Sequence, residues 1–143
     1  MFQKIIKVSI AVLLLAGIAS SCQYDKLLKS GNYKLKYQKA LEYYQAEDYT
    51  KAVGLFEQLN PVLKATDRAD TVLYYLSESY FEQENYILAE HHFQQFYQTF
   101  GNHRWAADAE FKSAYCNYML SPRPALDQGY TKKAINKDIR AYP

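Results

Sequence analysis

Few side chains in the 143-residue sequence have the type and spacing that catalysis requires. His91 and His92 are adjacent, and adjacent side chains on a helix diverge by about 100°, so the pair is poorly placed to share one metal ion. The acidic residues Glu82, Glu84 and Glu90 are expected to form a solvated helix face. There is no glycine-rich phosphate loop, no nucleophile elbow and no HExxH motif. The sequence therefore predicts a protein that is not an enzyme and that uses no metal and no cofactor.

The two cysteines are predicted to have different roles. Cys116 lies in the segment SAYCNYM, on the buried face of a predicted helix, where a small apolar side chain suits a core. Cys22 follows an apolar N-terminal segment directly. If the Cys22 sulfur is covalently modified, only one thiol remains and no disulfide can form within the chain.

The apolar N-terminal segment is too short to cross a bilayer. Residues 5–19 are apolar apart from Lys7 and Ser9, whereas a membrane span needs roughly 20 apolar residues. Two lysines, about a dozen apolar residues and then small residues are typical of an export signal. Residues 1–21 are therefore predicted to be a signal peptide.

The end of this segment, Ala19-Ser20-Ser21-Cys22, resembles the lipobox of bacterial lipoproteins, although leucine is commoner where Ala19 stands. The resemblance implies that the Cys22 thiol carries diacylglycerol and that the chain is cut just before it. Acyl chains contribute about 0.8 kcal/mol per buried methylene, so several of them form a firm anchor. Residues 22–32 would then be a lipidated linker. The alternative is an ordinary signal peptide followed by an incidental cysteine.

Two later segments repeat one pattern. YYQAEDYTKAVGLFEQL (43–59) and YFEQENYILAEHHFQQF (80–96) agree at positions that are all 37 residues apart. The matched pairs are Tyr43 with Tyr80, Glu47 with Glu84, Tyr49 with Tyr86, Ala52 with Ala89, and Phe56 with Phe93. A fixed period of this size predicts a solenoid, in which each unit buries its apolar face against the next.

The unit resembles the tetratricopeptide repeat, which consists of helix A, a tight turn and helix B. Ala52 and Ala89 match the small residue where two helices cross at about 8–10 Å, and Asp48 and Asn85 are predicted helix N-caps. Glutamates 47 and 84 replace the usual turn glycine. The resemblance implies an all-α, tetratricopeptide-repeat helical solenoid of about three helix pairs that follows a lipoprotein signal peptide.

The repeat domain is predicted over residues 33–143, with units at about 33–66, 67–101 and 102–143. Pro61 is expected to end or kink the first helix B, and Thr66 or Asp67 to start the second unit. Gly101 and Asn102 are expected to end the second helix B and to cap the next helix.

The third unit is irregular. Residues 105–120 predict its helix A, two prolines interrupt residues 121–131, and a final helix carries Ala134 at the packing position. No polar capping helix follows, so we expect the natural protein to be longer.

A binding groove is predicted along the A helices, at positions that alternate with the packing ones. These positions are Lys34, Tyr37, Leu41, Tyr44 and Gln45 in the first unit, and Thr71, Tyr74, Glu78, Phe81 and Glu82 in the second. Tyr37 with Tyr74, and Tyr44 with Phe81, would form an aromatic ladder suited to peptide capture. Lys34 and Lys36 could attract a C-terminal carboxylate. The alternative is that these tyrosines pack between helices.

The net charge does not favour nucleic acid as a partner. It is +2, and removal of residues 1–21 leaves fifteen basic and fifteen acidic residues. Lysines are nevertheless concentrated in the first unit, at positions 26, 29, 34, 36, 39 and 51. This zoning could orient a charged partner, although solvated faces also produce it.

The lipobox, the EYY and YYL helices and the segment SPRPALDQ before KAI together resemble BamD-type outer membrane assembly lipoproteins, in the form found in Bacteroidetes-type sequences. The resemblance implies a non-catalytic scaffold of the β-barrel assembly machinery, lipid-anchored on the periplasmic face of the outer membrane. Gln23 after the cysteine agrees with that location. The implied partners are unfolded outer membrane proteins and a BamA-type assembly subunit. The alternatives are a SusD-like nutrient-binding lipoprotein and a generic periplasmic tetratricopeptide adaptor.

Overall fold

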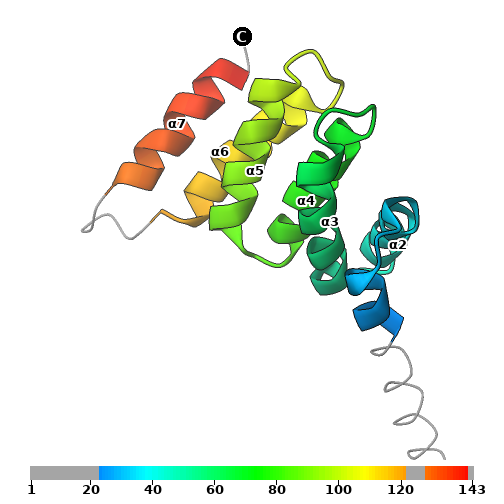
Figure 1. Cartoon of the computed structure of the whole chain (residues 1–143). Helices are drawn as coiled ribbons and strands as arrows, with labels where there is room; N and C mark the ends of the chain where they lie inside the picture. Colours follow the sequence, from blue (N-terminus) through cyan, green and yellow to red (C-terminus); the bar gives the residue numbers. More distant parts are fainter. Residues whose placement is uncertain (1–22, 122–127, 142–143) are drawn as a thin grey trace, which may run out of the picture.

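The computed structural model describes residues 23–121 and 128–141, and over these ranges the chain is helical and contains no strand (Figure 1). The predicted signal peptide, Cys22 and most of the proline-containing interruption lie outside them. The helices are α2 (Tyr33–Gln45), α3 (Tyr49–Leu63), α4 (Ala69–Glu82), α5 (Tyr86–Thr99), α6 (Ala106–Met119) and α7 (Gly129–Ala141). Residues 23–29 form a further short helix. None of the helices in the described ranges has the length and apolar character to span a membrane.

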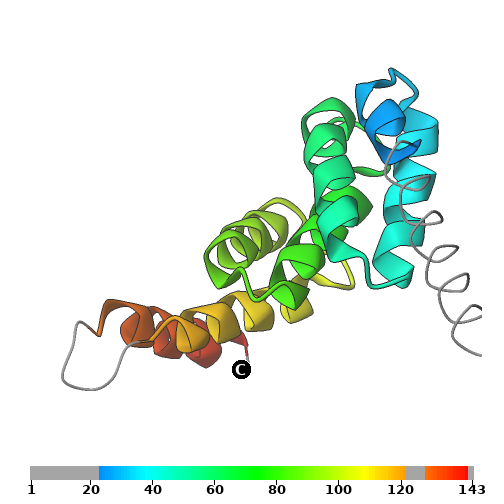
Figure 2. The same cartoon turned by 90° about the horizontal axis from the view of Figure 1, so that it is seen from below.

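Successive helices pack side by side into a stack, with residues 23–29 at one end and α7 at the other (Figures 1 and 2). Each helix contacts the next, and α2 also touches α4. We call α2, α4 and α6 the A helices and α3, α5 and α7 the B helices. The prediction of an all-α fold with the form of a helical repeat solenoid is thereby confirmed.

The turns between A and B helices follow the predicted repeat. Asp48 and Asn85 are N-caps, and their side chains accept hydrogen bonds from the backbone N–H of Lys51 and Leu88. Each cap satisfies an amide that the first helical turn leaves without a partner.

The core is built from the predicted small and aromatic positions. Ala52, Ala89, Phe56 and Phe93 are all fully buried, as expected where helices approach closely. Cys116 is also fully buried, which agrees with its predicted place in the core.

Two helix ends differ from the prediction. Helix α3 continues past Pro61 to Leu63, so this proline does not end the helix. Helix α5 ends at Thr99, and Asn102 does not cap α6, whose N-cap residue is Trp105. The Trp105 ring stacks on Tyr74 at the start of α6.

The predicted linker is partly structured, because residues 23–29 form a helix that packs on α3. The Tyr24 hydroxyl donates to the Lys51 carbonyl at 3.1 Å, and the Tyr24 ring meets Tyr43 edge-on. Because Gly54 has no Cβ, the Tyr24 hydroxyl can occupy the space beside its backbone. This packing was not predicted, since the seven-residue segment is too short for a periodic pattern.

Candidate functional site

The predicted groove residues of α4 are largely covered by α6. Tyr74 is only 9% exposed, and its ring stacks on Trp105 with 4.4 Å between centroids. Its hydroxyl donates to Asp108 Oδ2 at 2.5 Å. Burial, together with this bond to a carboxylate, raises the pKa of Tyr74. Tyr74 therefore holds two A helices together and presents little surface to a partner.

Glu78 is likewise buried beneath α6, with 6% of its surface exposed. Lys112 Nζ donates to Glu78 Oε1 at 2.6 Å and lies 3.3 Å from Asp108 Oδ2. Burial raises the pKa of Glu78, and the Lys112 ammonium opposes that shift. Burial lowers the pKa of Lys112, but the two carboxylates outweigh it and leave that pKa raised. The ion pair of Glu78 with Lys112 therefore links α4 to α6 inside the protein.

The predicted positions of α2 are in part packed and in part exposed. The Tyr44 ring meets Tyr75 at 4.8 Å, and the Arg68 guanidinium lies 4.9 Å from the Tyr37 ring centroid. Leu41 packs partly buried against the core, whereas Lys34 and Gln45 are exposed. Burial raises the pKa of Tyr44, as expected for a ring held between helices.

The other residues predicted for the groove are also partly exposed and partly bonded within the protein. Glu82 is exposed, and Thr71 bonds the neighbouring Asp70. Lys36 is 3% exposed, and its ammonium donates to the Leu28 carbonyl and to Gln58 Oε1, so it is not available for a carboxylate.

The aromatic ladder that was predicted from the sequence does not form. No ring contact joins Tyr37 to Tyr74, or Tyr44 to Phe81, within the described residues. Contacts between α4 and α6 instead join residues 34 apart, namely Tyr74 with Asp108, Glu78 with Lys112, and Phe81 with Tyr115. The contacts of α4 with α6 are thus offset by about one helical turn from the 37-residue repeat, because 34 falls three residues short of it.

Three exposed aromatic side chains lie on α6. Phe111, Tyr115 and Tyr118 are 40%, 39% and 65% exposed. Their rings are 6.4 Å and 6.1 Å apart in succession, and Tyr115 meets Phe81 at 5.8 Å. The row therefore runs from the end of α4 along α6.

The sequence analysis missed these three residues, although a signal was present. They stand 37 positions after Tyr74, Glu78 and Phe81, so extending the repeat by one unit reaches all of them. The irregular length of the third unit concealed this register.

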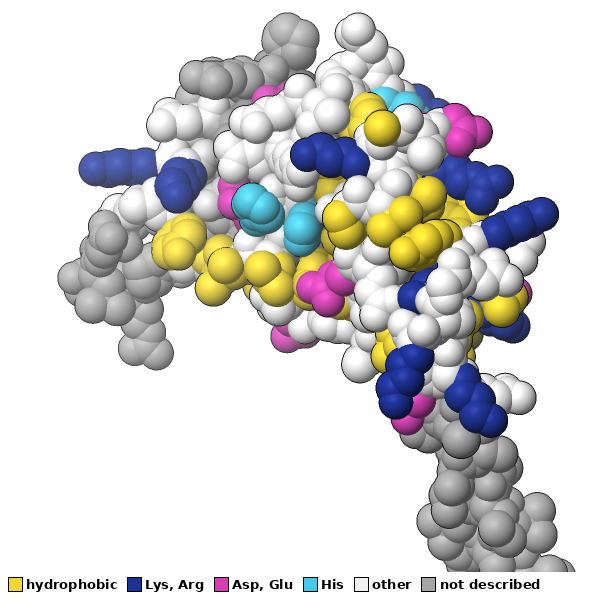
Figure 3. Space-filling view, viewed as in Figure 1, with side chains coloured by type: hydrophobic (Ala, Val, Ile, Leu, Met, Phe, Trp, Pro, Cys, Tyr) yellow, Lys and Arg dark blue, Asp and Glu magenta, His cyan; other side chains and the backbone are white. Residues whose placement is uncertain are grey.

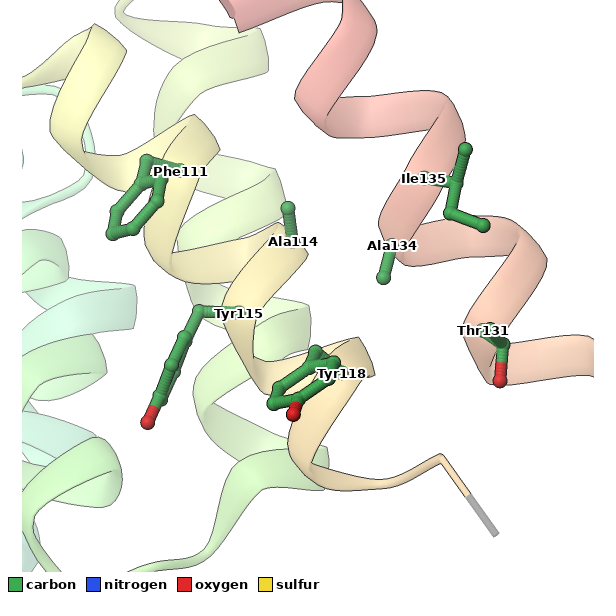
Figure 4. A pocket seen from close by; sticks show the side chains of 7 residues that line it. All are labelled: Phe111, Ala114, Tyr115, Tyr118, Thr131, Ala134 and Ile135. Atoms are coloured by element: carbon green, nitrogen blue, oxygen red, sulfur yellow. The ribbon is translucent and has the colours of Figure 1, made fainter. Parts of the chain in front are cut away.

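A groove lies between α6 and α7 beside this aromatic row (Figure 4). It encloses about 240 Å³ and is lined by Phe111, Ala114, Tyr115, Tyr118, Thr131, Ala134 and Ile135. Figure 4 shows the three rings following α6, while Thr131, Ala134 and Ile135 come from α7. We call it the α6–α7 groove. Its lining contains no charged side chain, so it suits an apolar or aromatic side chain.

The described residues contain no group of histidine, cysteine and acidic side chains that could hold a metal ion. His91 and His92 contact each other at 5.1 Å between ring centroids, and His92 stacks on Tyr80. In comparisons with known proteins, no family and no curated protein matches this chain.

Proposed function

We propose that this protein is a non-catalytic scaffold of the β-barrel assembly type, which binds unfolded outer membrane proteins through the α6–α7 groove. The observation that carries the proposal is the row of aromatic side chains at Phe81, Tyr115 and Tyr118, beside an uncharged groove. Aromatic rings offer a large contact area with few rotors to order, which favours peptide capture.

The chemistry of the expected ligand matches this surface. Strands of outer membrane barrels alternate apolar and polar residues and carry aromatic girdles. Every second side chain of such a segment points to one side. One aromatic side chain could enter the α6–α7 groove while the next lies on Tyr115 and Phe81.

The proposal also includes the tetratricopeptide class of the repeat and the lipid anchor at Cys22. The repeat class is supported by the five position pairs at a spacing of 37 residues. The anchor is supported by the length of the apolar segment and the small residues before the cysteine. Together they would hold the solenoid at the periplasmic face of the outer membrane.

Peptide binding tests the groove directly. A fluorescent peptide that copies a barrel C-terminal strand, with alternating aromatic residues, is titrated with the full chain in detergent and followed by anisotropy. Replacing both Tyr115 and Tyr118 with alanine should weaken binding at least thirtyfold, since an aromatic anchor commonly contributes about 2 kcal/mol.

The matched control is Tyr33→Ala, which removes a tyrosine of similar exposure (43%) at the opposite end of the stack. It should leave the affinity unchanged. Equal affinity for the wild type and the Tyr115/Tyr118 variant, with helicity preserved in both, would refute groove binding.

The expected partner subunit requires a separate experiment. Purification of the tagged protein from membranes should recover a BamA-type assembly subunit. Recovery of a glycan-uptake receptor would instead favour the SusD-like alternative, and recovery of neither would favour a generic adaptor.

A further inference from the structure

We propose that the end of the solenoid formed by residues 23–35 binds the headgroups of anionic phospholipids. This inference concerns a different surface from the α6–α7 groove. It rests on the anchoring part of the proposed function, because Cys22 directly precedes this helix, and not on peptide binding.

Lysines without a carboxylate partner are concentrated at this end. Lys26, Lys29 and Lys34 are exposed, and none of them forms an ion pair within the described residues. The only acidic residue from position 23 to position 39 is Asp25. Figure 3 shows basic side chains beside the place where the described chain begins.

A hollow of about 370 Å³ lies beside Lys26 at this end of the solenoid. Its lining comprises Gln23, Lys26, Leu27, Ser30, Asn32 and Leu35. The exposed Leu35 (40%) and the partly buried Leu27 supply apolar surface, while Lys26 supplies a positive charge. A cation next to apolar surface matches the boundary between a phosphate headgroup and the upper part of an acyl chain.

Ser30, which lines the hollow, gives a second indication of a ligand that does not depend on charge. The Ser30 hydroxyl is buried, and within the described structure it has no hydrogen-bond partner. Buried hydroxyls are normally hydrogen-bonded, and leaving one without a partner is unfavourable. A phosphate or glycerol oxygen in the hollow would supply that partner once the Ser30 side chain rotates toward it.

Two nearby lysines already have partners within the protein and are therefore not part of the proposed headgroup site. Lys36 is buried and bonds the Leu28 carbonyl, and Lys39 pairs with Glu42 at 2.6 Å. The available charge is therefore confined to Lys26, Lys29 and Lys34. Each lysine near an anionic membrane surface favours the bound orientation about fivefold.

This contact would fix the direction of the solenoid relative to the membrane. Residues 23–29 and α7 lie at opposite ends of the stack (Figures 1 and 2). With the basic end on the headgroups, the α6–α7 groove would stand away from the membrane, where an unfolded chain can reach it.

Lysine acetylation tests the proposal on the full chain. The protein is reconstituted in vesicles of phosphatidylethanolamine and phosphatidylglycerol (7:3), or of phosphatidylcholine alone, and recovered by flotation. Acetylation by an N-hydroxysuccinimide ester is then followed by mass spectrometry. Lys26, Lys29 and Lys34 should react at least fivefold more slowly in the anionic vesicles. Lys132 and Lys133 on α7 should react equally in both.

Two further measurements separate headgroup contact from simple anchoring. Added 0.5 M salt should abolish the protection, because it reduces the screening length to a few ångströms. The Lys26→Gln/Lys29→Gln variant should lose most of the protection of Lys34. A chain that floats with both vesicles but reacts equally in them would overturn headgroup binding while leaving the anchor intact. A chain that floats with neither would overturn both.

Discussion

Glu47 and Glu84, 37 residues apart, share a left-handed backbone conformation, with φ of 59° and 58°. In each turn the next amide closes a hydrogen bond of 2.9 Å, from Asp48 to the Tyr43 carbonyl and from Asn85 to the Tyr80 carbonyl. In the tetratricopeptide repeat, which the unit resembles, glycine normally stands at these two positions. The chain therefore keeps the turn geometry and accepts the strain of a side chain at positive φ.

Replacing these glutamates with glycine should stabilise the protein. A non-glycine residue at positive φ costs about 1 kcal/mol, and the greater unfolded-state freedom of glycine cancels part of the gain. We expect about 0.5–1 kcal/mol for each substitution, and additive effects because the turns are separate. Urea denaturation of Glu47→Gly, Glu84→Gly and the double variant measures this. Glutamine at the same positions removes the charge but keeps the strain, so it should show no comparable gain. A gain with glutamine as large as with glycine would point to charge repulsion instead.

The effect of Gly54→Ala on the free energy of unfolding should change sign when Tyr24 is also replaced. A Cβ at residue 54 would collide with the Tyr24 hydroxyl, so Gly54→Ala should destabilise the wild type by about 1 kcal/mol. It should also expose residues 23–29 to trypsin at Lys26 and Lys29. In a Tyr24→Ala background the collision is absent, and the same substitution should stabilise α3 by about 0.5–1 kcal/mol. Destabilisation of equal size in both backgrounds would show that Tyr24 does not pack on Gly54.

Lys112 should contribute far more to stability than an ion pair of the same length on the surface. Its bond to Glu78 and the bond from Lys39 to Glu42 both measure 2.6 Å, but Glu78 is buried, whereas Lys39 and Glu42 are exposed. Lys112→Met leaves a buried carboxylate without its partner, and we expect a loss of about 2–3 kcal/mol in thermal or urea denaturation. Lys39→Met should change little. Adding Glu78→Gln to Lys112→Met should restore part of the loss. Similar losses for Lys112→Met and Lys39→Met would contradict this role.

The sequence predicted the repeat because the repeat depends on local chemistry. Ala52, Ala89, Asp48 and Asn85 are specified by close helix crossings and by cap geometry, which recur in each unit. The groove was predicted less well, because exposure depends on the neighbouring unit. Tyr74 occupies a groove position in its own helix, but Trp105, the N-cap of α6, and Asp108 of α6 cover it. Which rings remain exposed depends on the offset of about one turn between α4 and α6, and no single-helix pattern contains that offset.

His92 should make stability depend on pH. Burial lowers the pKa of His92, and the neighbouring His91 lowers it further, while a bond to Gln95 and the charge of Glu57 oppose the shift. The imidazole stacks on Tyr80 with an interplanar angle of 6°, and its Nδ1 is buried with no hydrogen-bond partner in the described structure. The folded protein therefore favours neutral His92.

The unfolded chain binds this proton near pH 6.5, whereas the folded chain binds it only at lower pH. The free energy of unfolding should thus fall as the pH drops through about 6.5 and stop falling below the folded pKa. His92→Phe keeps the stacking and removes the titration, so it should lose less stability than the wild type between pH 7.5 and pH 5.5. Urea denaturation at both pH values measures the difference. His91→Asn, at the exposed neighbouring position, should retain most of the wild-type dependence. A loss of stability in His92→Phe as large as in the wild type would contradict this role for His92.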